Sequence, residues 1–319
     1  MLVFGTSEFA VPTLDALAGR HDVAGVVTQP DRPAGRGHKL VATPVKRAAE
    51  ARGLRVFTPE KLKPFVDQAR SLGADAFVVA SYGKIVPQML LDLVDIAFNV
   101  HPSLLPLYRG ATPLQSAIHD GRTQTGLSII AMDAGMDTGD VLVQELAEIG
   151  PDETYGELHD RLAKRGAALA VTAVERYANG TLERTPQSAI ARELGVSDDE
   201  IARTLTRPLT KDDLVIDWTR TARQVVDHVR SLSPMPAART TAPSGETIKV
   251  LRAHVSSEED GIVRGAEPGV VVPRTSGGMP ATASRAGDGR DVVLDVVVPP
   301  GRRAMSGTEY AQSHRARTS

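Results

Sequence analysis

The chain has 319 residues, a formal net charge of -2 and no cysteine. Its length predicts two domains, since a domain usually holds about 100–200 residues, and the absence of cysteine excludes disulfides, thiolate nucleophiles and cysteine-ligated metals. No apolar run reaches the ~18–20 residues that a membrane helix needs. A secretory signal is not expected at the N-terminus, because the first residues show no basic region, long apolar stretch or small-residue cleavage site. We therefore expect a cytoplasmic protein without a membrane partner.

The first part of the chain alternates short apolar runs with segments of helical period, which predicts an α/β unit with a parallel sheet. A helix is expected at 45–52, because Thr43 can cap it, Pro44 suits the first helical position and Gly53 can end it. The strands are expected at 2–5, 23–28, 76–80, 96–100, 127–132 and 141–146, and further helices at 113–120 and 154–179.

The rest of the chain predicts a connector and a smaller β domain. Scattered Thr, Arg and Pro residues make 190–208 an expected linker between domains at 1–189 and 209–319. In the second domain a helix at 221–232 precedes short valine-rich runs between Gly, Pro and Ser clusters, which is typical of a small barrel or sandwich. These runs lie at 248–251, 269–272 and 292–298, and a Gly-, Ala- and Ser-rich stretch at 276–289 is expected to be a loop.

Asn99 and His101 lie where the expected strand 96–100 ends. Ligands of open α/β sheets bind outside the carboxyl ends of the strands, and residues two apart on an extended segment project from the same face. One side chain could hold a carbonyl oxygen while the other handles a proton. Both could equally satisfy backbone groups at a turn, and the spacing leaves these two interpretations open.

Three aspartates, Asp133, Asp137 and Asp140, lie in a Gly-rich loop between two expected strands. Such a loop makes turns, in which Asp is common for its own reasons, but an Asp can also orient a His toward a reacting group. A metal site is disfavoured, because no His or further Asp follows at a recognised ligand spacing.

Basic residues gather in the loop 28–39, where Arg32, Arg36 and Lys39 lie among Gly and Pro. The loop is either a solvated surface segment or an arm that contacts a nucleic-acid backbone. Because the second domain carries only 15 Lys and Arg against 13 Asp and Glu, any nucleic-acid contact must be local. The residues alone thus predict an α/β enzyme with a His, Asn and Asp site of open chemistry.

A resemblance takes the prediction further. The run 98–113, which reads FNVHPSLLPLYRGATP, is followed by Thr125-Gly126-Leu127-Ser128 and Asp137-Thr138-Gly139-Asp140. Together these motifs closely resemble the 10-formyltetrahydrofolate-dependent formyltransferases. The start at Gly5-Thr6, the loop 29–39 and a second domain are similar to the branch that formylates initiator methionyl-tRNA, whereas the branch that formylates glycinamide ribonucleotide resembles only the first domain.

The resemblance implies a doubly wound, mostly parallel, Rossmann-like sheet in the first domain and an oligonucleotide-binding-like β-barrel that contacts tRNA in the second. Asn99, His101 and Asp137 fall on the family's catalytic residues. The implied reaction moves the formyl group of 10-formyltetrahydrofolate, without a metal, to methionine on initiator methionyl-tRNA for translation initiation. The implied folate contacts are Tyr82, Gly83, Ser103, Leu104, Leu105 and Pro106, and the implied tRNA contacts are Arg36, Arg32 and Lys39.

Two other functions share parts of this pattern. A formyltransferase that acts on an amino sugar nucleotide would carry the same catalytic motif, and the charges of the loop 32–39 would then matter little. An RNA-binding module with an inert α/β domain would bind tRNA in a salt-dependent way without binding folate. A monomer is expected by default.

Overall fold

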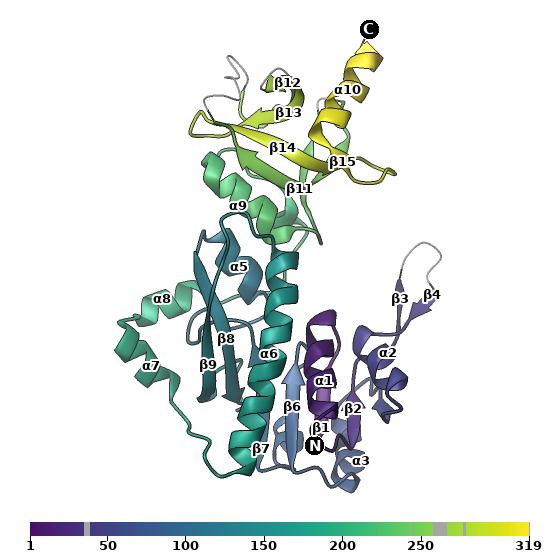
Figure 1. Cartoon of the computed structure of the whole chain (residues 1–319), viewed down its shortest axis with the longest axis vertical. Helices are drawn as coiled ribbons and strands as arrows, with labels where there is room; N and C mark the ends of the chain where they lie inside the picture. Colours follow the sequence, from purple (N-terminus) through teal and green to yellow (C-terminus); the bar gives the residue numbers. More distant parts are fainter. Residues whose placement is uncertain (35–38, 243, 258–266, 277–278, 319) are drawn as a thin grey trace. The chain divides into compact units, whose positions relative to one another are not determined.

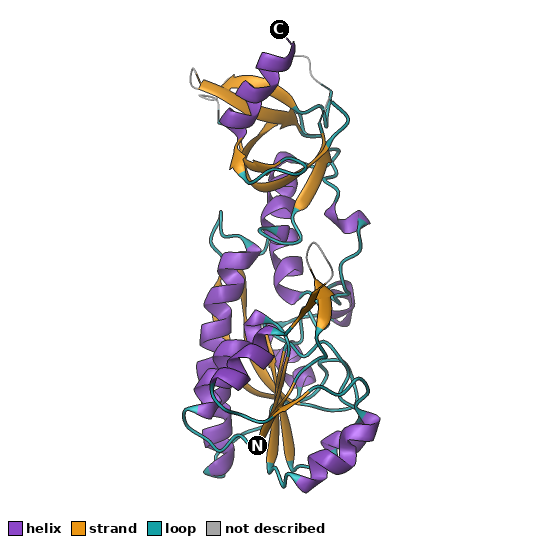
Figure 2. Cartoon of the chain, turned by 90° about the vertical axis from the view of Figure 1, so that its right-hand side faces the viewer, coloured by secondary structure: helices purple, strands orange, loops and turns teal. Residues whose placement is uncertain are grey.

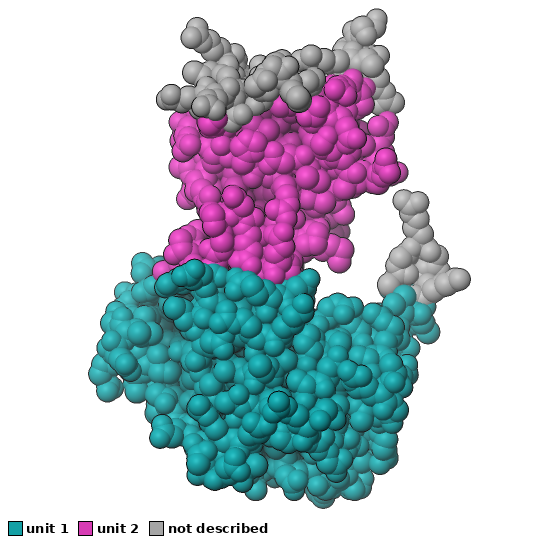
Figure 3. All heavy atoms as spheres, viewed as in Figure 1, with its two compact units in different colours: residues 1–113, 124–148, 159–207 teal, residues 114–123, 149–158, 208–319 magenta. Residues whose placement is uncertain are grey.

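The computed structural model describes residues 1–34, 39–242, 244–257, 267–276 and 279–318 (Figure 1). The chain forms two compact units, which Figure 3 shows in different colours. Unit 1 holds residues 1–113, 124–148 and 159–207, and unit 2 holds residues 114–123, 149–158 and 208–319. Two short segments from the middle of the chain therefore belong with its C-terminal part. No described helix is long and apolar enough to cross a membrane.

Unit 1 is built on a seven-stranded sheet with the order β5-β2-β1-β6-β7-β8-β9. The first five strands in this order, β5, β2, β1, β6 and β7, pair in parallel, whereas β8 and β9 are antiparallel to their neighbours. The predicted α/β unit with a mostly parallel sheet is confirmed. Its strands are β1 (Leu2–Gly5), β2 (Gly25–Val27), β5 (Val56–Phe57), β6 (Ala76–Ala80), β7 (Ile96–His101), β8 (Gln124–Ala131) and β9 (Val141–Glu148).

Helices cover both faces of this sheet, which Figure 2 shows nearly edge-on. On one face Leu2 and Phe4 of β1 pack in an apolar cluster with helical residues. On the other face α6 lies so close that a Cβ on Gly166 would meet Val100 at 3.1 Å and Leu127 at 3.3 Å. The helices of this unit are η1 (Glu8–Ala10), α1 (Val11–Ala18), α2 (Pro44–Ala51), η2 (Lys63–Phe65), α3 (Val66–Ser71), α4 (Gln88–Leu91), α6 (Tyr155–Ala178), α7 (Gln187–Leu194) and α8 (Asp198–Arg203). Of α6, only the part from residue 159 onward belongs to unit 1.

The first turn of α2 confirms the predicted capping. The Thr43 hydroxyl accepts a hydrogen bond from the Lys46 backbone N–H at 3.0 Å, and Pro44 occupies the first helical position. After the helix, Gly53 has a φ of 68°, a left-handed conformation that favours glycine. Local sequence signals therefore set both ends of this helix.

Unit 2 combines an antiparallel sheet with helices. Trp218 lies in its apolar core, where the indole N–H donates to the Thr240 hydroxyl at 2.9 Å, and a capping box of Thr221 and Gln224 starts α9. The sheet order is β10-β11-β14-β13-β12, with β15 paired to β14. The elements are α5 (Pro113–His119, from residue 114), η3 (Asp212–Leu214), α9 (Ala222–Leu232), β10 (Ala238–Thr241), β11 (Thr247–Val255), β12 (Val272–Ser276), β13 (Met279–Arg285), β14 (Asp291–Val298), β15 (Met305–Ser306) and α10 (Gly307–Thr318).

The structure corrects two predictions. The stretch 276–289 contains strand β13, not only loop, because Thr282 and Ser284 are buried in the sheet together with their alanine neighbours. The expected strand 269–272 begins only at residue 272, with β12. Within the expected linker 190–208 lie the second half of α7 and all of α8. The assignment of 1–189 and 209–319 as separate domains stays a prediction.

Candidate active site

Strand β7 brings Asn99 and His101 to the same carboxylate. The ladders with β6 and β8 fix the register of β7, so these alternate residues project from one face of the sheet. The Asn99 side-chain amide donates to Asp137 Oδ1 at 3.1 Å, and His101 Nδ1 lies 3.5 Å from Asp137 Oδ2. Of the three aspartates in the loop 133–140, the structure thus joins Asp137 to the pair.

The His101 side chain is buried, with 5% of its surface exposed. Its Nε2–H donates to the Tyr108 carbonyl oxygen at 2.9 Å, and because a carbonyl can only accept, this nitrogen carries a hydrogen. Nδ1 is therefore the nitrogen that can accept a proton. It faces the Asp137 carboxylate, so a positive charge on the imidazole has a negative group beside it.

A backbone N–H also holds the Asp137 side chain in place. Its Oδ2 accepts the Gly110 backbone N–H at 2.9 Å. Asp137 itself has a φ of 56°, in the left-handed region that non-glycine residues rarely adopt. Asp133 has a different role, since its Oδ1 accepts from the Gly135 N–H and the Thr138 hydroxyl at 3.0 and 2.7 Å. Asp133 therefore shapes the turn, which is one of the interpretations that the sequence left open.

The expected folate residues of the loop after β7 differ in exposure. Ser103 and Leu105 are fully buried and Pro106 is buried, whereas Leu104 is half-buried. The Ser103 hydroxyl donates to the Leu107 carbonyl at 2.7 Å, so this hydroxyl bonds within its own loop. Because they are buried, the side chains of Ser103 and Leu105 support the shape of the loop. Of these four residues, Leu104 presents the most surface.

Tyr82 and Gly83, the other expected folate residues, follow β6. The Tyr82 ring is buried edge-on against Phe4, 5.6 Å between centroids, and burial raises the pKa of its hydroxyl to about 12. Its carbonyl accepts from the Thr6 hydroxyl and from the Gln29 side-chain amide, each at 2.8 Å. Gly83 is exposed and has a φ of 75°. Tyr82 thus anchors the turn from the core, while Gly83 presents backbone to solvent.

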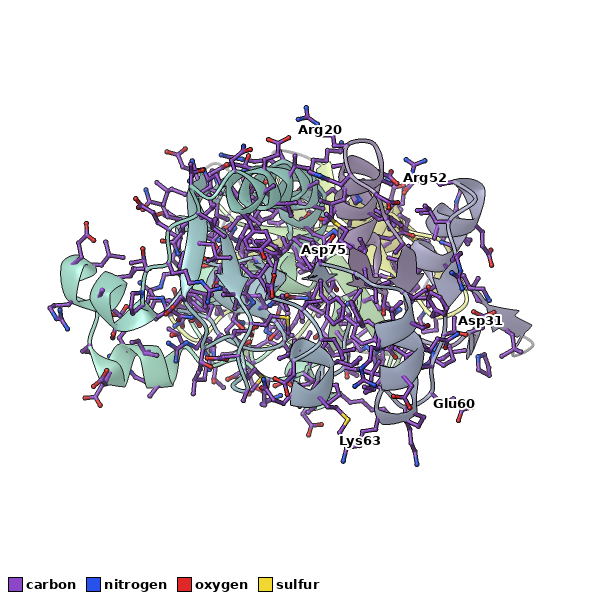
Figure 4. All side chains as sticks on the ribbon, turned by 90° about the horizontal axis from the view of Figure 1, so that it is seen from below. Arg20, Asp31, Arg52, Glu60, Lys63 and Asp75 are labelled. Carbon is purple, nitrogen blue, oxygen red and sulfur yellow. The ribbon has the colours of Figure 1, made fainter. Side chains whose placement is uncertain are left out.

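The basic loop forms a short hairpin of β3 (Arg32–Ala34) and β4 (Lys39–Val41). Arg32 is exposed and donates to the Gln29 side-chain carbonyl at 2.7 Å. Lys39 begins β4, and Arg36 lies outside the described residues. At the base of the hairpin Asp31, labelled in Figure 4, forms an ion pair with Lys46 of α2 at 2.8 Å.

Sequence reasoning missed three contributors to this site: the Tyr108 carbonyl, the Gly110 N–H and Gln187. The first two act through the backbone, for which side-chain chemistry gives no signal. Gln187 begins α7, and its amide nitrogen donates to the carbonyls of Asp137 and Gly139, each at 2.8 Å. Among the described residues no group of three or more His, Asp or Glu is arranged to hold a metal ion.

Comparisons with known proteins give matches over most of the chain. The family model described as formyl transferase matches residues 1–174, and the model of its C-terminal domain matches residues 208–315. The chain is 44% identical over 317 residues to the methionyl-tRNA formyltransferase of Symbiobacterium thermophilum, covering 97% of this chain and 91% of the relative. It is 39% identical over 311 residues to that of Pelotomaculum thermopropionicum, covering 96% and 93%.

A solved structure shows the same fold at low sequence identity. It is the N-formyltransferase from Helicobacter canadensis in complex with folinic acid and dTDP-3-aminofucose, with a TM-score of 0.65 at 17% identity. The alignment covers 92% of this chain and 97% of that chain.

Proposed function

Because the chain belongs to the formyl transferase family, we propose that it transfers the formyl group of 10-formyltetrahydrofolate to the α-amino group of methionine on initiator methionyl-tRNA. The observation that carries the proposal is the position of Asp137, whose carboxylate accepts a hydrogen bond from Asn99 and lies 3.5 Å from Nδ1 of His101. Relatives that match over nearly the whole of both chains carry the name methionyl-tRNA formyltransferase, which supports methionyl-tRNA as the acceptor.

Asn99 stabilises the oxyanion. One N–H of its side-chain amide is held by Asp137 Oδ1, which fixes the plane of the amide and leaves the second N–H to donate elsewhere. When the amine attacks the formyl carbon, the formyl oxygen becomes negative and takes this second hydrogen bond. A fixed donor of this kind contributes on the order of 3–4 kcal/mol to the transition state.

His101 and Asp137 manage the proton. The new bond joins the α-amino nitrogen to the formyl carbon, and the bond from that carbon to N10 of the folate then breaks. The amine must lose a proton and N10 must gain one, and Nδ1 of His101 is the nitrogen that can take it up. The Asp137 carboxylate offsets the positive charge of the imidazole during this step. Proton transfer by a positioned side chain accelerates such reactions about 10²–10⁴-fold.

The folate lies between the loops that follow β6 and β7 in this proposal. The residues predicted for it are Tyr82, Gly83 and the run Ser103–Pro106. Gly83 and Leu104 present surface to a ligand, whereas Tyr82, Ser103 and Leu105 hold the loops in shape from the core.

The β3–β4 hairpin contacts the tRNA through Arg32, Arg36 and Lys39 in this proposal. The exposure of Arg32 supports this, as does the anchoring of the hairpin base by Asp31 and Lys46. Arginine and lysine bind phosphate without reading sequence, so their contribution falls as salt concentration rises.

The test is transfer of a labelled formyl group from 10-formyltetrahydrofolate to methionyl-tRNA. We expect transfer by the natural chain and a loss of at least about a hundredfold in Asn99→Ala. The triple change Arg32→Ala, Arg36→Ala and Lys39→Ala should raise the KM for tRNA and weaken its salt dependence.

Arg20→Ala is the matched control for the loss of an arginine. Arg20 projects from the periphery in Figure 4, in an exposed ion pair with Glu175, and such pairs contribute little. If the natural chain fails to formylate methionyl-tRNA but formylates an amino sugar nucleotide, the proposed acceptor is wrong and the family assignment stands. Full activity in Asn99→Ala would refute the assigned site.

A further inference from the structure

Gln187 uses every hydrogen-bonding position of its side chain at the edge of the site. Its amide nitrogen donates to the carbonyls of Asp137 and Gly139, and its amide oxygen accepts from Nε and Nη2 of Arg109 at 2.9 and 2.7 Å. A primary amide offers two donors and two lone pairs, so the group is saturated. The side chain is also buried, with 4% of the residue exposed.

These bonds join the two loops that meet at the Asp137 carboxylate. The loop 133–140 carries Asp137 itself, and Arg109 immediately precedes Gly110, whose N–H donates to Asp137 Oδ2. In the contact between the Gly110 N–H and the Asp137 carboxylate, Gln187 therefore holds the acceptor loop through the Asp137 and Gly139 carbonyls and the donor loop through Arg109. The left-handed backbone of Asp137 is bound directly, at its own carbonyl.

The surrounding segment is attached to the same loops. Thr185 and Val141 exchange two backbone hydrogen bonds of 2.9 Å, and Ile190 of α7 packs on the apolar cluster that contains Leu105. Farther along, the backbone N–H of Thr206 donates to the Arg109 carbonyl at 2.8 Å. Residues 185–206 thus hold the loops from both ends.

We propose that Gln187 is a positioning residue for Asp137, and that residues 185–206 form part of the catalytic site. This segment lies between the two matched family regions, 1–174 and 208–315, and its sequence had suggested a connector. The kinetic part of the proposal rests on the proposed function, in which the distance between Asp137 and His101 governs the proton step. A shift of about 1 Å in such a group costs about a hundredfold in rate.

Two substitutions separate positioning from folding. Gln187→Met keeps the length of the side chain and removes all four hydrogen bonds. Gln187→Glu has nearly the same size and shape as the natural side chain, so it preserves the packing of α7. It keeps an acceptor for Arg109 but removes both donors to the loop 133–140. Ser188→Ala is the matched control, because Ser188 is the exposed next residue of the same helix.

We expect kcat to fall about a hundredfold in both Gln187 variants while KM for each substrate changes less than about threefold, with no change in Ser188→Ala. A residue that only supports folding would lower the thermal midpoint and the number of active sites, but leave kcat per active site unchanged. Natural kcat per active site in Gln187→Glu would therefore overturn the proposal.

Hydrogen exchange gives a readout that does not depend on the reaction. Backbone amides of residues 133–140 should exchange at least about fivefold faster in Gln187→Met than in the natural chain. The reason is that losing one hydrogen bond raises the population of the locally open, exchanging state by about a factor of five. Strands β1 and β6 should exchange at the same rate in both. If the natural chain shows no formyl transfer, the proposed function fails while this measurement still decides the positioning role, and unchanged exchange in 133–140 would refute it.

Discussion

Replacing Asp137 with asparagine should remove most of the catalysis while leaving the fold intact. In the natural site Oδ1 accepts from the Asn99 amide at 3.1 Å and Oδ2 accepts from the Gly110 N–H at 2.9 Å. An asparagine amide has one oxygen, so in either orientation its NH2 group faces one of these two donors. The variant loses one hydrogen bond and the negative charge beside His101.

The lost charge sets the size of the effect. At the 3.5 Å between His101 Nδ1 and Asp137 Oδ2, a unit charge pair with an effective dielectric constant of about 20 is worth about 5 kcal/mol. If the imidazole is positively charged in the transition state, the barrier rises by this amount, which is about three to four orders of magnitude in rate. We expect kcat to fall by that factor and KM for both substrates to stay within a few-fold.

The assay is single-turnover transfer of labelled formyl to methionyl-tRNA, with the thermal midpoint measured on the same samples. Asp75→Asn is the matched control, since Asp75, labelled in Figure 4, is exposed and directly precedes β6, whereas the site loops follow their strands. A kcat of folded Asp137→Asn within tenfold of the natural value would refute the electrostatic role given to Asp137.

Three further predictions concern stability and backbone geometry. Asp227→Ala should lower the free energy of unfolding by about 3–5 kcal/mol in a denaturant titration, because it leaves the Arg230 guanidinium, 2.6 Å away and also buried, without its counter-charge; a loss below about 1 kcal/mol would contradict this. Burial lowers the pKa of His228 from its ordinary 6.5 to about 4, so between those pH values the unfolded chain binds a proton that the folded chain does not, and stability is lost as pH falls. The thermal midpoint should therefore drop more steeply from pH 6.5 to pH 4 in the natural chain than in His228→Gln, and parallel curves would exclude His228 as the cause. Gly110→Ala should lower kcat at least tenfold and also lower the thermal midpoint, because its φ is 111° and a Cβ would lie 2.2 Å from the Thr206 carbonyl oxygen; natural kinetics would show that the Gly110 N–H does not hold Asp137.

Local signals in the sequence were sufficient for much of unit 1. The ends of α2 follow from Thr43, Pro44 and Gly53, and strand β6 has the predicted bounds. Strand β13 was missed, because its small and polar residues resemble a loop until the fold buries residues on both of its faces. Composition describes a segment alone, whereas burial depends on what the fold places beside it.

The site was predictable only where chemistry and spacing coincide. The spacing of Asn99 and His101 correctly placed them on one face of a strand, and the structure brings Asp137 to both. Gln187 could not be found in this way, because its bonds to carbonyl oxygens 48 and 50 residues earlier leave no local pattern. The proposed roles in folate and tRNA binding stay predictions that the kinetic experiments decide.

The division of the chain between the two units limits how far the protein can be taken apart. The backbone passes from one unit to the other at residues 113, 123, 148, 158 and 207. Within unit 2, the carbonyls of Gly150 and Glu153 accept hydrogen bonds from the buried Arg230. A fragment that ends at residue 207 would retain 114–123 and 149–158 without the C-terminal residues that pack on them, and a fragment that starts at residue 208 would lack both segments. We therefore expect that neither half folds as an independent module, and that exchanging C-terminal portions between relatives will require matched replacement of those two inner segments.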